Sequence, residues 1–88
     1  MKITYVGNTE ESYTILLDGK EQVKVSLGED SVIELVNQIR TDLSNKQYDN
    51  GKHTIDIKKL ADCIVIDVYD SELKFQDEFH YFFCDYIS

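Results

Sequence analysis

One stretch of this chain has helical periodicity, and the apolar segments on either side of it alternate instead. Between positions 31 and 45 the apolar side chains recur at the spacing of a helix with one buried face: Val32, Leu35, Val36, Ile39 and Leu43. Ser31 and Glu34 fit a capping box, in which a serine hydroxyl and a glutamate carboxylate bind free amides at the helix start. The pattern predicts a helix over about 31–45 that covers the apolar face of a sheet.

Five short segments alternate between apolar and polar residues, which is typical of strands with one buried face. They cover about residues 2–6, 13–17, 23–27, 54–60 and 64–69. Asp18-Gly19 lies between the second and third segments and indicates a hairpin, because both residues tolerate the positive φ of tight turns. We expect the fourth and fifth strands to form a second hairpin.

Residues 73–87 are compatible with two periodicities. A helical stripe would contain Phe75, Phe79, Phe82, Phe83, Tyr86 and Ile87. A period of two fits Leu73, Phe75, Phe79, Tyr81 and Phe83, but Asp77 interrupts it. We favour a helix from about Asp77 to Tyr86, with a strand as the alternative.

The predicted fold is therefore α+β, in the order β-β-β-α-β-β-α. It is a mostly antiparallel sheet of about five strands with one central helix and a C-terminal helix. With 88 residues, the chain is expected to form a single domain spanning 1–88.

The charge of the chain limits its partners. It has 17 acidic and 9 basic residues, for a formal net charge of −8. Contacts to phosphates need lysine and arginine, so the balance argues against direct binding of nucleic acid and against docking on anionic membranes. A basic protein surface is the natural complement, although acidity also serves solubility alone.

The sequence also predicts where the protein is found. It begins directly with strand-like residues rather than a signal peptide, and it contains no apolar run long enough for a membrane span. Cys63 and Cys84 have neither a CxxC nor a zinc-finger spacing, and are expected to be free thiols. These features predict a cytoplasmic protein.

Catalytic chemistry has few candidate residues. His53 lies in a polar loop and His80 in an aromatic segment, and neither is accompanied by a nucleophile motif. His80 and Cys84 would share a face of a helix, which is a weak signal for a metal site. We predict that the protein is not an enzyme and uses no metal or cofactor.

Acidic residues are concentrated toward the C-terminus. Residues 62–88 contain seven acids, while the only base among them is Lys74. If one side of the fold exposes this segment, it displays a negative patch interleaved with tyrosine, although a solvated surface explains the same charges. The predicted partner-binding residues are Asp67, Tyr69, Asp70, Glu72, Asp77 and Glu78. Asp67 is expected on the outward face of its strand, and Asp77 and Glu78 at the start of the last helix.

The chain resembles in kind the small acidic inhibitors that phages encode, including anti-CRISPR proteins and other DNA mimics. The resemblance rests on size, charge and the absence of Pro and Trp, and on an Asp-Gly strand pair followed by an acidic helix entry, GEDSVIELV at 28–36. It implies a protein that acts in the cytoplasm of a bacterial host, where it binds a basic nuclease, such as a CRISPR effector, and occludes its nucleic-acid site. No shared signature assigns individual residues.

Two other functions fit the same sequence. An immunity protein that neutralises a basic toxin nuclease would need the same charge complementarity. A structural or assembly module would instead self-associate through exposed aromatic residues among Tyr69, Phe75, Tyr81 and Tyr86. The oligomeric state is left open.

Overall fold

The computed structural model describes residues 1–87 and begins with a three-stranded antiparallel sheet. Its strands are β1 (Ile3–Gly7), β2 (Tyr13–Leu17) and β3 (Lys20–Val25), in the order β1-β2-β3. The predicted hairpin at Asp18-Gly19 is confirmed, with φ of 50° and 82° at these residues. β3 begins at Lys20 rather than at 23, because it pairs with β2 directly from the turn through a register shift between Ile15 and Leu16.

The predicted helix is confirmed as α1 (Glu29–Asn45), and the five apolar residues of its predicted stripe are all buried. The capping-box prediction is wrong. The helix begins two residues earlier, after Gly28, and no side chain among residues 1–87 caps it. The Ser31 hydroxyl instead donates a hydrogen bond to the carbonyl of Tyr86, which ties the C-terminal segment to the helix. Glu29 and Asp30 occupy the first turn, where negative charge complements the helix dipole.

The second half of the chain forms another three-stranded antiparallel sheet. Its strands are β4 (Thr54–Lys59), β5 (Cys63–Tyr69) and β6 (Phe75–Phe82), in the order β4-β5-β6. The predicted hairpin of β4 and β5 is confirmed.

The predicted C-terminal helix is wrong, because Asp77 and its neighbours form β6, followed by a short 3-10 turn, η1 (Phe83–Asp85). Phe79 and Tyr81 of β6 pack inward, and the Tyr81 hydroxyl donates to Asp42 of α1 over 2.6 Å. β6 thus gives β5 a partner along its second edge. Of the residues that fitted a period of two, Phe79 and Tyr81 face inward, whereas a register shift leaves Phe75 exposed on the other face.

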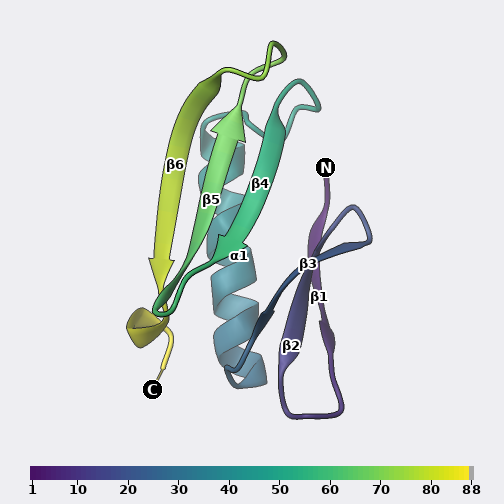
Figure 1. Cartoon of the computed structure of the whole chain (residues 1–88), viewed down its shortest axis with the longest axis vertical. Helices are drawn as coiled ribbons and strands as arrows, with labels where there is room; N and C mark the ends of the chain where they lie inside the picture. Colours follow the sequence, from purple (N-terminus) through teal and green to yellow (C-terminus); the bar gives the residue numbers. More distant parts are fainter. Residues whose placement is uncertain (88) are drawn as a thin grey trace.

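The layers explain which surfaces stay open. In Figure 1, α1 lies behind the β4-β5-β6 sheet, the β1-β2-β3 sheet lies beside it, and β6 forms an outer edge. Buried side chains from both sheets and from α1 form one core cluster. The residues described therefore form an α+β fold with six strands in two sheets, rather than about five strands in one. Among residues 1–87, no helix is long and apolar enough to cross a membrane.

Candidate functional site

The face of the second sheet that points away from α1 carries a group of neighbouring acidic and basic side chains. Strand register places Asp56 of β4, Asp67 of β5 and Glu78 of β6 in one row across the sheet. The adjacent row contains Lys58, Val65 and His80. We call this surface the outer face and define it by these six residues together with Tyr69, Phe75 and Phe82.

Asp67 occupies the centre of the outer face and is almost fully buried, with 7% of its side chain exposed. Lys58 Nζ lies 3.0 Å from Asp67 Oδ2. The other oxygen, Oδ1, is buried and has no hydrogen-bond partner among the described residues. An unsatisfied buried acceptor of this kind costs about 1–3 kcal/mol.

The pKa of Asp67 results from opposing effects. Burial alone would raise it, but interactions with Glu78 and with the Lys58 ammonium outweigh burial and hold the pKa below its ordinary value. The lowered pKa keeps the carboxyl group of Asp67 in its charged form at neutral pH, and its Oδ1 accepts no hydrogen bond from the described residues.

Glu78 and His80 lie on the open edge strand. His80 Nε2 is 2.6 Å from Glu78 Oε1, and about two fifths of each side chain is exposed. Together with Lys58, Leu60, Val65 and Asp67, they line a groove of about 250 Å³. The lining of the groove thus combines apolar side chains with charged ones, among them the buried Asp67.

Asp77 lies on the opposite side of the sheet from Glu78, because successive side chains of a strand alternate between faces. Its Oδ2 accepts hydrogen bonds from Lys46 Nζ and from the Tyr48 hydroxyl, each over 2.9 Å. The hydrogen bond from Lys46 is the main reason that the pKa of Asp77 lies below its ordinary value. Asp77 therefore fastens β6 to the segment that follows α1.

The Asp77 contacts predict a difference in acid stability. A carboxyl whose pKa is lowered by folding stabilises the protein above its ordinary pKa of 3.8, and this contribution is lost as pH falls through the lower folded value. Asp77→Asn should therefore lower the free energy of unfolding at pH 7 by about 0.5–1.5 kcal/mol. Urea denaturation at pH 7 and pH 3 should show that the deficit shrinks in acid. A deficit that is unchanged at pH 3 would contradict this role.

The turn between β5 and β6 contains the other predicted residues. Asp70 Oδ1 accepts hydrogen bonds from the backbone amides of Glu72 and Lys74, each over 2.9 Å, so Asp70 shapes the turn. Glu72 is exposed and lies 3.6 Å from Lys74 Nζ. Tyr69 packs edge-on against Phe75, with ring centroids 6.2 Å apart.

The structure thus brings together part of the predicted site. Asp67, Tyr69 and Glu78 share the outer face, and Asp70 and Glu72 lie in the turn at one end of the second sheet. Asp77 does not join them. Sequence reasoning missed Asp56 and Lys58, and it considered His80 only as a catalytic or metal-binding candidate. Antiparallel pairing with a strand at 75–82 would have placed Asp56 in the row of Asp67 and Glu78. It would have placed Lys58 in the row of Val65 and His80.

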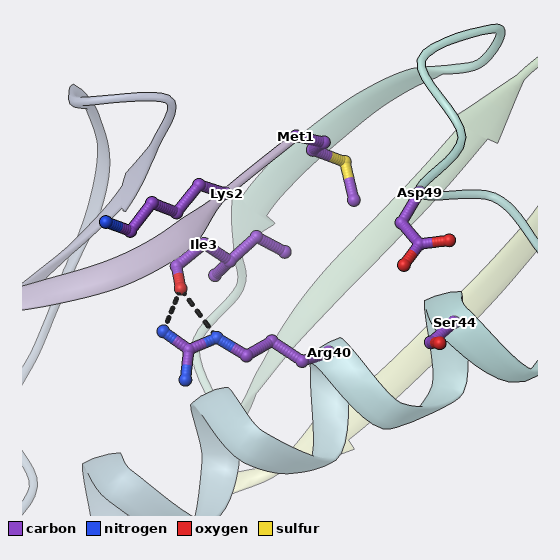
Figure 2. A pocket seen from close by; sticks show the side chains of 6 residues that line it. All are labelled: Met1, Lys2, Ile3, Arg40, Ser44 and Asp49. Carbon is purple, nitrogen blue, oxygen red and sulfur yellow. Dashed lines mark hydrogen bonds between the residues drawn. The ribbon is translucent and has the colours of Figure 1, made fainter.

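A second cleft, of about 390 Å³, lies between β1 and α1 and is shown in Figure 2. Arg40 reaches from α1 to β1, where Nε donates to the carbonyl of Ile3 over 2.8 Å and a second guanidinium nitrogen donates to the same oxygen. Another nitrogen donates to Asn37. Arg40 thus connects α1 to β1 through these hydrogen bonds, which is a structural role.

Comparisons with known proteins do not add to this description. No protein-family model matches the chain, and searches of curated proteins and of solved structures gave no match. The case for a function therefore rests on the site, because fold class by itself does not imply function.

Proposed function

We propose that this protein is a non-enzymatic inhibitor that binds a basic nucleic-acid-binding protein, such as a CRISPR effector or a toxin nuclease, and occludes its nucleic-acid site. The single observation that carries the proposal is the outer face, which combines exposed aromatic side chains with a row of three carboxylates. Tyr69 and Phe75 lie at one end and Phe82 at the other, with the acids between them.

The apolar contribution comes from exposed aromatic and aliphatic side chains on and beside the outer face. Phe75 is 61% and Phe82 40% exposed, and Leu73 and Leu60 in the flanking turns are more than half exposed. Aromatic residues are enriched in protein interfaces, where they supply much of the binding free energy. Covering this surface with a partner would remove apolar area from water.

The electrostatic contribution comes from charge complementarity. The outer face holds Asp56, Asp67 and Glu78 against one lysine, and Glu72 extends the negative charge at the turn. Phosphate-binding arginine and lysine residues of a nuclease accept carboxylates in place of phosphates. A protein of net charge −8 would also approach such a basic site faster than a neutral one.

The proposal predicts that binding depends on the outer face and on salt. The protein is tagged and used to retain basic nucleases from bacterial lysates over a series of salt concentrations, with and without competing DNA. Glu72→Lys with Glu78→Lys should lose the nuclease that the wild type retains at low salt. A matched variant, Glu10→Lys with Glu11→Lys in the exposed β1–β2 turn, changes the net charge by the same amount. At each salt concentration it should retain at least half as much nuclease as the wild type. If both variants lose the partner alike, the outer face is not the site.

Self-association is a second candidate, favoured by the open edge of β6. The edge is eight residues long and has exposed Phe75 and Phe82, and long open edges template strand pairing. Antiparallel pairing of β6 with a second copy about Phe79 would place Glu78 opposite His80 of that copy. Light scattering at 10–500 μM would show a dimer that is insensitive to salt under this candidate, and a monomer under the first.

A further inference from the structure

We propose that Asp67 and Glu78 form a receptor for the guanidinium group of an arginine side chain supplied by the partner. This inference rests on the proposed function, because it assigns the residue type through which a basic partner engages the outer face. The site is the groove that Asp67 and Glu78 line together with residues of all three strands of the second sheet, and Oδ1 of Asp67 is buried beside it.

The first observation is the unsatisfied acceptor. Asp67 Oδ1 is buried and receives no hydrogen bond from the part of the chain that the structure describes, while Oδ2 is bound by Lys58. Buried polar atoms in native proteins nearly always have a partner, so an atom without one needs an explanation. The side chain is more than nine-tenths buried and lines the groove, so a donor that reached Oδ1 from the groove would satisfy it.

The second observation is the spacing of the acceptors. Asp67 and Glu78 are directly paired across neighbouring strands, which places their side chains next to each other on one face. A guanidinium group carries five N–H donors in a rigid plane and can bind two carboxylates at once. An ammonium group is a single point charge, and Lys58 already supplies one on the other side of Asp67.

The walls of the groove also suit an arginine. Leu60 and Val65 provide apolar surface for the methylene stem of a long side chain. His80 lines the groove next to Glu78, and its ring offers a flat surface on which a guanidinium plane can stack. The row of Asp56, Asp67 and Glu78 carries three carboxylates. Even if His80 were charged, Lys58 and His80 together would balance only two of them.

The experiment uses an acetylated tetra-arginine peptide as the probe and a tetra-lysine peptide as the comparison. Both are titrated at pH 7 into protein labelled with ¹³C and ¹⁵N, and the side-chain carboxyl resonances are followed. We expect saturable shifts centred on Asp67 and Glu78, with the arginine peptide binding at least about tenfold more tightly than the lysine peptide.

Three variants test the assignment. Asp67→Asn and Glu78→Gln should each weaken the arginine peptide by about tenfold. Glu10→Gln should leave it within about twofold, since Glu10 is exposed in the β1–β2 turn and lies outside the groove. Glu78 is on an exposed edge strand, so Glu78→Gln is expected to fold even if Asp67→Asn does not.

Three results would overturn the proposal. One is equal affinity for the two peptides, and another is full arginine affinity in Glu78→Gln. The third is a carboxyl titration that shows a proton shared by Asp67 and Glu78 at pH 7 together with no shift on adding peptide. If a nuclease is still retained through the outer face in any of these cases, the arginine site is wrong while the proposed function stands.

Discussion

Replacing Ile39 by alanine is expected to lower the free energy of unfolding by about 2–5 kcal/mol, a large fraction of the roughly 5–15 kcal/mol typical of a domain. Ile39 lies on the buried stripe of α1 and has no exposed surface. Its truncation removes apolar contacts and leaves a cavity in the cluster that joins the helix to both sheets.

The control is Leu73→Ala in the β5–β6 turn, where 70% of the residue is exposed. It should change the free energy of unfolding by no more than about 0.5 kcal/mol. Urea denaturation of both variants at pH 7 makes the comparison. Similar small effects for the two would contradict the placement of α1 over the core.

Replacing Lys58 by methionine is the second large expected effect. It keeps most of the aliphatic stem but removes the ammonium that binds Asp67 Oδ2, so the buried carboxylate would have no donor on either oxygen. We expect the free energy of unfolding to fall by about 1–3 kcal/mol at pH 7. The loss is limited to this range because the Lys58 side chain is half exposed.

Two further measurements separate this ion pair from other effects of losing a lysine. Lys74→Met removes the exposed ammonium near Glu72 and should change stability by less than about 0.5 kcal/mol. Adding Asp67→Asn to Lys58→Met should recover part of the loss, because a neutral amide costs less to bury than a charge. If the double variant loses as much free energy of unfolding as Lys58→Met and Asp67→Asn lose when added together, Lys58 and Asp67 are not coupled.

The difference between predicted and observed structure is clearest at Asp77 and Glu78. In a helix both would have been exposed near its start and adjacent to the acidic turn. In β6 they alternate, so Glu78 reaches the outer face while Asp77 turns toward Lys46 and Tyr48. The contacts that make Asp77 acceptable at a partly buried position come from 29 and 31 residues away in sequence, so a local pattern does not contain them.

Other features were predictable because their causes are local. The alternation of apolar residues in β2, the stripe of α1 and the turn chemistry of Asp18-Gly19 each depend on neighbouring residues, and the structure has all three. Ser31 shows the opposite case. Its sequence context fits a helix cap, but its hydroxyl binds Tyr86, 55 residues away.

Asp67 combines both situations. Its alternation with Ile66 and Val68 correctly placed it on the side of the sheet away from α1. Its burial could not be predicted from alternation, because it is the central member of a row and is covered by side chains of both neighbouring strands. Asp67 is therefore a buried residue that lines a groove, rather than the exposed surface charge that was expected.

The most direct test of the central claim is a competition experiment with a purified nuclease that the protein retains. Fluorescently labelled nucleic acid is bound to the nuclease, and its anisotropy is followed as the protein is added. We expect complete, competitive release by the wild type and at least about tenfold weaker competition by Glu72→Lys with Glu78→Lys. A complex in which protein and nucleic acid are bound to the nuclease together, with anisotropy undiminished at saturation, would contradict occlusion through the outer face.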